Sequence, residues 1–225
     1  MMNKDIYWKI INSAKDKCAD IDDVSKAVES KLKALPLKDI VKFQHIHDEY
    51  MKNAHTIGLW DAASVMNKGC CSDDGFHYFK PWLIAQGKDV YMDALKNPDS
   101  LADLSAMPTE YGYYELESLN YAAAIAYEEL TDKNIYEAKC SLTVEEKVEI
   151  CDEIEFEPTI DRPRKNKDIP VYLPKLYAKF VPGMSEPEEY HWNINSAFFR
   201  ERIQYMSESD KQEWQEESQN FEQKM

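Results

Sequence analysis

The chain has 225 residues, of which 44% are hydrophobic and 31% are charged. It is therefore long enough for one domain, or one domain with an appendage, and it can bury an apolar core. Its longest stretches without a charged residue span ten residues, whereas a membrane-spanning helix needs about 20 apolar residues. The first residues show no apolar segment and no cleavage site typical of a secretory signal. We therefore expect a soluble cytoplasmic protein with no membrane partner.

The net charge of −15 is concentrated in one part of the chain. Residues 101–161 contain 3 Lys and 16 acidic residues, and all four Arg follow residue 161. So acidic a chain is repelled by phosphate backbones, which argues against nucleic acid as a partner. An acidic surface suits a basic protein, because opposite charges steer the encounter. The alternative interpretation is a solvated face that keeps the protein in solution.

The five cysteines are odd in number, irregularly spaced and without a C-x-x-C pair. This pattern indicates free thiols in a reducing compartment rather than a disulfide framework or a zinc site. The chain also has no Gly-rich phosphate loop and no G-x-S-x-G elbow. These features predict a protein without a cofactor and without a recognisable catalytic motif.

Apolar side chains recur every three or four residues through the first hundred residues, which is the pattern of amphipathic helices. Pro36 suits the start of one helix and Gly58 its end, whereas Ser72 is typical of a helix N-cap. The predicted helices cover residues 6–14, 22–35, 36–54, 59–67, 72–86 and 90–95.

A longer acidic helix is predicted over residues 115–131. Its apolar face would comprise Leu116, Leu119, Ala123, Ala126 and Leu130. Six of the ten prolines lie between residues 158 and 187, which favours loops after residue 131, with one short helix over 175–180.

Residues 171–173 are a weak strand candidate, and helices are expected again over 192–206 and 209–221. The predicted fold class is all-α, a compact bundle of about seven to nine helices with a loop-rich C-terminal third.

The turn at Asp73 and Asp74 is the strongest candidate for a binding site. Two adjacent carboxylates beside aromatic side chains can hold a cation, an amine or an arginine of a partner. The aromatic candidates are Trp60, Tyr78 and Trp82. The alternative is purely structural, because carboxylates in the first turn of a helix favour its dipole. Gly75 in this first turn is unfavourable for a helix and suggests the close approach of a backbone or a ligand.

A second acidic run, Asp152, Glu153, Glu155 and Glu157, is a candidate surface for a basic partner, with a solvated or disordered segment as the alternative. His45 and His47 do not predict a metal site. Two residues separate them by about 200° around a helix, so they cannot grip one ion, and His47 falls on the core side with Phe43 and Tyr50.

Several sequence phrases are shared with a known family. The most specific runs Gly69-Cys70-Cys71-Ser72-Asp73-Asp74-Gly75-Phe76-x-Tyr78-Phe79 and continues as Trp82-Leu83-Ile84-x-x-Gly87-Lys88. In these phrases the chain resembles an uncharacterised bacterial domain family of unknown function, over about residues 3–180. The resemblance implies a helical domain over 1–180, with 181–225 as a helical extension, and it brings no established reaction.

Two classes of function follow from these features. The first is a non-catalytic binding protein that presents acidic residues to a basic protein, such as an immunity-type or regulatory partner-binder. The alternative is a small enzyme with a carboxylate site at Asp73 and Asp74, assisted by Tyr78 or His77. The enzyme requires a carboxylate in a buried cleft, where its pKa is raised. The oligomeric state does not follow from the sequence.

Overall fold

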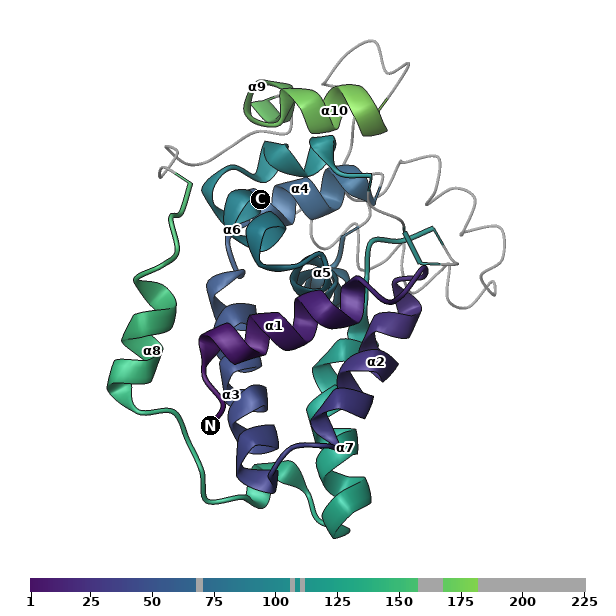
Figure 1. Ribbon diagram of the computed structural model, residues 1–225. Coiled ribbons are helices and arrows are strands. Elements are labelled where there is room, and N and C mark those ends of the chain that lie inside the picture. The colour runs from purple at the N-terminus through teal and green to yellow at the C-terminus, as the bar shows by residue number, and fades with distance from the viewer. Residues whose placement is uncertain (68–70, 106–107, 110–111, 158–167, 182–225) are drawn as a thin grey trace, which may run out of the picture.

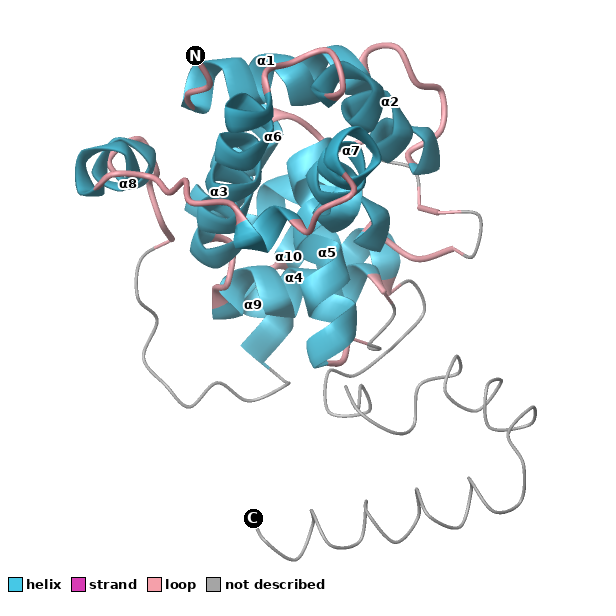
Figure 2. Cartoon of the chain, turned by 90° about the horizontal axis from the view of Figure 1, so that it is seen from below, coloured by secondary structure: helices cyan, strands magenta, loops and turns pink. Residues whose placement is uncertain are grey.

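The computed structural model describes residues 1–67, 71–105, 108–109, 112–157 and 168–181. These residues form helices and turns and contain no strand (Figure 2), which confirms the predicted all-α class. The elements are α1 (Lys4–Lys15), α2 (Asp22–Leu32), α3 (Leu37–Asn53), α4 (Ile57–Met66), α5 (Asp73–Ala85), α6 (Lys88–Lys96), η1 (Pro98–Asp103), η2 (Glu117–Tyr121), α7 (Ala122–Thr131), η3 (Ile135–Glu137), α8 (Val144–Cys151), α9 (Ile169–Tyr172) and α10 (Pro174–Phe180). Within these ranges no helix is long and apolar enough to cross a membrane.

Helix α1 crosses one face of the bundle (Figures 1 and 2) and contacts α2, α3 and α5. Helix α7 packs against both α2 and α3, and α10 packs on η1 and α4 at one end of the molecule. Helix α8 lies at the periphery, beside α3. The core is therefore built between α1, α3 and α5, with the later helices added around it.

Aromatic rings fill the contact between α1, α3 and α6. The rings of Tyr7 and Tyr50 stack at 5.3 Å, and Trp8 lies 4.7 Å from Tyr50. Tyr91 meets Tyr50 edge to face, and its hydroxyl donates to the Tyr50 carbonyl over 2.6 Å. These four side chains are buried. Each such ring stabilises the core through the large apolar area that it removes from water, and each hydroxyl requires a partner there.

The boundary between α3 and α4 differs from the prediction. Helix α3 ends at Asn53, and Thr56 caps α4 by accepting from the Leu59 N–H. Gly58 therefore lies in the first turn of α4 and does not end the preceding helix. The Thr56 hydroxyl determines where α4 begins, because it accepts from an N–H at the helix start that has no partner within the helix.

The predicted helix over residues 115–131 begins later than expected. Residues Glu117–Tyr121 form the 3₁₀ element η2, and α7 starts at Ala122. The buried side chains Leu116, Leu119 and Ala122 are three residues apart, which is the period of a 3₁₀ helix and brings them onto one line. Leu130, predicted on the apolar face, is 48% exposed.

The segment after residue 131 contains more helix than predicted. Helix α8 begins with a capping box, in which Thr143 and Glu146 each accept from the backbone N–H of the other. Residues 171–173 are not a strand, because α9 covers Ile169–Tyr172, and the short helix expected over 175–180 is α10. The helices predicted over 192–206 and 209–221 lie outside the described residues.

Asp99 joins this late segment to the body of the bundle. Its carboxylate is 6% exposed and accepts from the N–H groups of Lys175 and Leu176, at 3.1 and 2.9 Å. Pro174 precedes them at the first position of α10. A residue of η1 therefore caps a helix that lies more than seventy positions later in the chain.

Replacing Asp99 by Ala should lower the free energy of unfolding by about 1–3 kcal/mol, because two N–H groups at the start of α10 lose their acceptor. Urea denaturation measures this change. The control is Asp103→Asn, which breaks only the exposed ion pair with Lys175 and should leave the midpoint nearly unchanged. Equal stability of Asp99→Ala and the native protein would contradict the capping role.

Candidate binding site at the α5–η2 corner

The predicted Asp73–Asp74 turn meets the acidic segment before α7. The Leu116 N–H donates to the Tyr78 carbonyl over 3.0 Å, which fixes the start of η2 against α5. We call the resulting surface the α5–η2 corner. It comprises Asp73, Asp74, His77 and Tyr78 from the α5 side, and Glu115, Glu117 and Asn120 from the η2 side.

The first turn of α5 has the structure expected from its sequence. Ser72 is the N-cap, and its hydroxyl accepts from the Gly75 N–H over 3.1 Å. Asp73 and Asp74 follow and are both exposed. The Glu115 carboxylate lies so close to Gly75 that a Cβ there would be 3.2 Å from Oε1. A third carboxylate, that of Glu115, therefore lies beside the first turn of α5.

The aromatic candidates divide into two that reach the surface and one that does not. Trp60 is half-buried, stacks on Phe76 at 4.9 Å and donates its indole N–H to the Cys71 carbonyl. Tyr78 is half-buried beside the corner carboxylates. Its pKa is raised first by the charge of Glu117, then by burial and by Asp74. Trp82 is fully buried and supports the site from beneath without reaching a ligand.

A chain of hydrogen bonds leads from the corner into the core. His77 Nε2 lies 3.4 Å from Asn120 Nδ2, and Asn120 Oδ1 lies 3.0 Å from His47 Nε2. His47 Nδ1 lies 2.9 Å from the Tyr7 hydroxyl. Tyr7 and His47 are buried, whereas Asn120 is half-buried and His77 exposed. This relay connects α1, α3, η2 and α5. The sequence alone indicates only His47 as a core residue and His77 as an auxiliary group.

Burial lowers the pKa of both histidines. For His47, burial outweighs the hydrogen bond to Asn120 and the charge of Asp48, which act in the opposite direction. For His77, burial and Lys80 outweigh Asp74 and Glu117. Both rings are therefore neutral at pH 7, since the ordinary histidine pKa is about 6.5.

One comparison with known proteins gives a match. Residues 2–129, more than half of the chain, match a family described as "Protein of unknown function (DUF4240)". The chain belongs to this family. No curated protein and no solved structure matches it significantly. The corner and the relay lie wholly inside the DUF4240 region, whereas the second acidic run lies beyond it.

The segment that follows the DUF4240 region holds its acidic residues against the bundle. We call residues 140–157 the belt. Glu153 accepts from Tyr50 at 2.7 Å, Lys88 at 3.0 Å and Lys4 at 3.2 Å. Burial alone would raise the pKa of Glu153, but these three hydrogen bonds outweigh it and lower the pKa.

The other acidic residues of the belt differ in their surroundings. Glu155 pairs with Lys96 at the surface, and Asp152 is exposed. The Glu157 carboxylate lies over Gly58 at the start of α4, and the Glu157 N–H donates to the Leu95 carbonyl. The structure thus spreads the predicted acidic run over several helices and gives most of its carboxylates partners within the chain.

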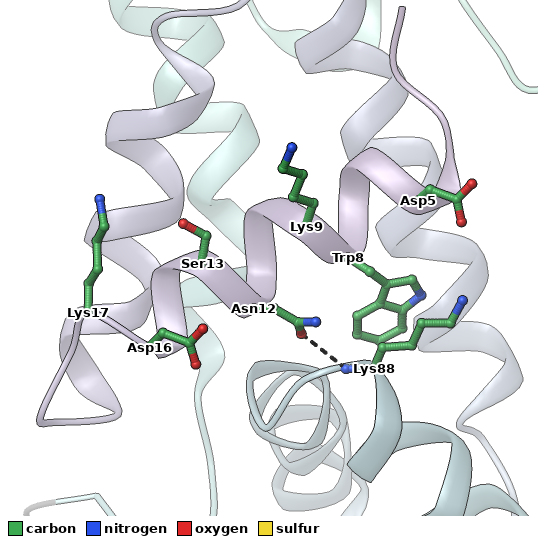
Figure 3. Close-up of a pocket in the computed structure, with 8 residues that line it drawn as sticks. All are labelled: Asp5, Trp8, Lys9, Asn12, Ser13, Asp16, Lys17 and Lys88. Carbon is green, nitrogen blue, oxygen red and sulfur yellow. Dashed lines mark hydrogen bonds between the residues drawn. The ribbon is translucent and has the colours of Figure 1, made fainter.

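The larger of the two surface grooves described here lies on α1 (Figure 3). Its volume is about 600 Å³, and it is lined by Asp5, Trp8, Lys9, Asn12, Ser13, Asp16, Lys17 and Lys88. Asn12 accepts from the Lys88 N–H across it, at 3.2 Å, and Trp8 is only 2% exposed. The second groove, of about 170 Å³, lies beside Cys18 and Val24. None of the predicted site residues lines either groove.

The histidines of α3 serve the packing. His45 Nε2 lies 2.7 Å from the Cys140 carbonyl of the belt, and His47 belongs to the relay. Among the described residues, no group of three His, Cys, Asp or Glu side chains is arranged to hold a metal ion.

Replacing Glu153 by Gln should destabilise the protein at pH 7 by about 1 kcal/mol, because three donors lose a charged acceptor that is partly screened by solvent. The folded pKa of Glu153 is lowered. Its contribution is therefore complete above the ordinary glutamate pKa of about 4.3 and is lost as the pH falls through the lower folded value.

Urea denaturation of both proteins between pH 7 and pH 3 measures this difference. The gap should narrow as the pH falls below the ordinary glutamate pKa and should close below the lower folded value. A gap as wide at pH 3 as at pH 7 would show that the carboxylate charge is not the cause. The control is Glu155→Gln, which affects only the exposed pair with Lys96.

Proposed function

We propose that this DUF4240 protein is a non-catalytic binding protein whose α5–η2 corner receives a basic group of a partner protein. One observation carries the proposal: the exposed carboxylate of Asp74, next to Asp73 in the first turn of α5, shares a surface with Glu117, and both Asp74 and Glu117 act on His77 and Tyr78. Such a cluster suits an arginine or lysine side chain, because carboxylates accept charge-assisted hydrogen bonds and aromatic rings attract cations.

The corner is favoured over the belt as the binding surface. Forming a complex through Glu153 would require its separation from Tyr50, Lys4 and Lys88. Asp73 and Asp74 carry no such cost, because they are exposed at the helix start. In the belt, Asp152 and Glu155 remain as exposed acidic residues that a basic partner can reach, and they form the competing surface.

The aromatic side chains have different parts in this proposal. Trp60 and Tyr78 supply partly exposed ring surface next to the carboxylates, whereas Trp82 holds the base of α5 through rings 5.2 Å away on Phe79 and Tyr114. A basic side chain of the partner would thus contact the carboxylates first and the aromatic rings second. This arrangement is typical of interfaces in which an arginine is the anchor.

The enzymatic alternative lacks support from the geometry. It requires a carboxylate in a buried cleft, but Asp73 and Asp74 are exposed and line neither described groove. A binding protein requires only complementary charge and shape. An acidic immunity-type or regulatory protein that acts in the cytoplasm is the concrete form that we propose, in agreement with the free thiols of Cys18, Cys140 and Cys151.

The double variant Asp73→Asn, Asp74→Asn should lose the partner while it keeps the fold. The native protein and the variant are used as baits in a lysate of the source organism, and the affinity of any basic protein retained by the native bait is then measured. We expect at least a tenfold weaker complex for the variant, which corresponds to about 1.4 kcal/mol. The affinity of the native protein should also fall as the salt concentration rises.

The matched control is Asp152→Asn, Glu155→Gln, which removes the same number of charges from the belt. Circular dichroism and thermal unfolding confirm that both double variants are folded. If only the control loses the partner, binding belongs to the belt. If neither variant loses it and salt has no effect, the proposal is wrong.

A further inference from the structure

The relay beneath the α5–η2 corner has one consistent arrangement of hydrogen atoms. Asn120 turns its Oδ1 to His47 and its Nδ2 to His77. His47 therefore carries its proton on Nε2 and donates it to Asn120, so its Nδ1 accepts from the Tyr7 hydroxyl. His77 accepts from Asn120 at Nε2 and carries its own proton on Nδ1. Every hydrogen atom in the relay thus points from the core toward the surface.

This direction makes the relay sensitive to a proton at its outer end. A proton on His77 Nε2 turns that atom into a donor, which then faces the donor Asn120 Nδ2. The contact survives only if the whole chain reverses. Asn120 would turn its amide over, His47 would move its proton to Nδ1, and Nδ1 would donate to the Tyr7 oxygen.

The core opposes the reversal. In the reversed relay, the hydroxyl hydrogen of Tyr7 loses the acceptor that it has in His47. Tyr7 is fully buried among the rings of Trp8, Phe43 and Tyr50. A buried donor without an acceptor is costly, so the hydroxyl holds Asn120 in the orientation that suits a neutral His77.

We propose that the buried Tyr7 hydroxyl sets the protonation state of His77, through His47 and Asn120, and that it thereby makes binding at the corner pH-sensitive. The relay itself does not depend on a partner, whereas its effect on binding rests on the proposed function of the corner. Tyr7, His47 and Asn120 are positioning residues for His77 in this scheme.

The other charged and titratable groups around the relay act on the same equilibrium. His77 is faced by Asp74, Tyr78 and Lys80 of α5, by Glu117 of η2 and by His55 before α4. His47 is faced by Asp48 of its own helix. When His77 is protonated and released from Asn120, the acceptors next to it are the carboxylates of Asp74 and Glu117. A charged His77 therefore occupies the carboxylates that a basic partner would use, and the affinity for that partner falls as the pH falls through the lowered pKa of His77.

The test is an NMR titration of the free protein labelled with ¹⁵N, from pH 8 to pH 5.5, which reports the tautomer of each histidine. At pH 8 we expect His47 to carry its proton on Nε2 and His77 on Nδ1. The side-chain amide of Asn120 should change its chemical shift with the midpoint of His77, while His47 remains neutral. His47 with its proton on Nδ1 at pH 8, or an Asn120 amide that ignores the titration of His77, would overturn the proposal.

The variant Tyr7→Phe directly tests the effect of the Tyr7 hydroxyl on the protonation of His77, because it removes the hydroxyl without changing any charge. His47 Nδ1 then lacks a partner in either direction of the relay, so the preference for the native direction weakens and a protonated His77 can more readily keep Asn120 Oδ1 as its acceptor. We expect the His77 midpoint to move to higher pH. Tyr91→Phe is the matched control, since it removes a buried hydroxyl of the same core that bonds to the Tyr50 carbonyl, and it should leave His77 unchanged.

Equal His77 midpoints in the native protein and in Tyr7→Phe would refute the role of Tyr7. If Tyr7→Phe does not fold, the tautomers of the native protein still decide whether the relay has the proposed direction. The NMR readouts use no partner, so their outcome is separate from that of the binding experiment. A native relay with the expected tautomers but without a partner at the corner would refute the proposed function alone.

Discussion

Three tyrosine rings meet in the core of this protein, and each of their hydroxyls must find a partner away from water. Tyr91 bonds to the backbone of α3, Tyr50 bonds to Glu153 of the belt, and Tyr7 bonds to His47. Each hydrogen bond connects a different part of the chain to the core. The Tyr91 bond joins α6 to α3, the Tyr50 bond holds the belt, and the Tyr7 bond begins the relay that ends at the α5–η2 corner. The apolar contact among the rings supplies stability, and the hydroxyls determine the connections.

Local signals in the sequence predicted most of the helices and several of their ends. Ser72 caps α5 as expected, and the apolar spacing located α1, α2 and α6. One error occurred where a contact between distant segments decides the structure. The hydrogen bond from Leu116 to Tyr78 ties the start of η2 to α5, and nothing in residues 115–121 predicts that bond. Helix α8 was missed although its signal was local, because Thr143 and Glu146 have the spacing of a capping box.

The candidate site was predictable only in part. Asp73, Asp74 and Tyr78 stand close together in the sequence on the first turns of α5, and Trp60 belongs to the preceding helix α4. Glu117 and Asn120 join them through the fold, at a separation of about forty residues, and no periodicity connects them. Burial was harder still to judge, since Trp82 and Tyr78 are four residues apart on one helix but only Tyr78 reaches the surface. For the second acidic run, composition indicated the charge correctly and gave no sign that Lys4, Lys88 and Lys96 would form ion pairs with it.

Residues that follow the family region also make contacts that stabilise it. The family region ends at residue 129, yet Tyr50, Lys4 and Lys88 inside that region share the carboxylate of Glu153, and Asp99 caps a helix that begins at Pro174. A fragment cut at the family boundary would leave a tyrosine hydroxyl and several ammonium groups without their acceptor. The contacts that stabilise the family region therefore extend beyond residue 129.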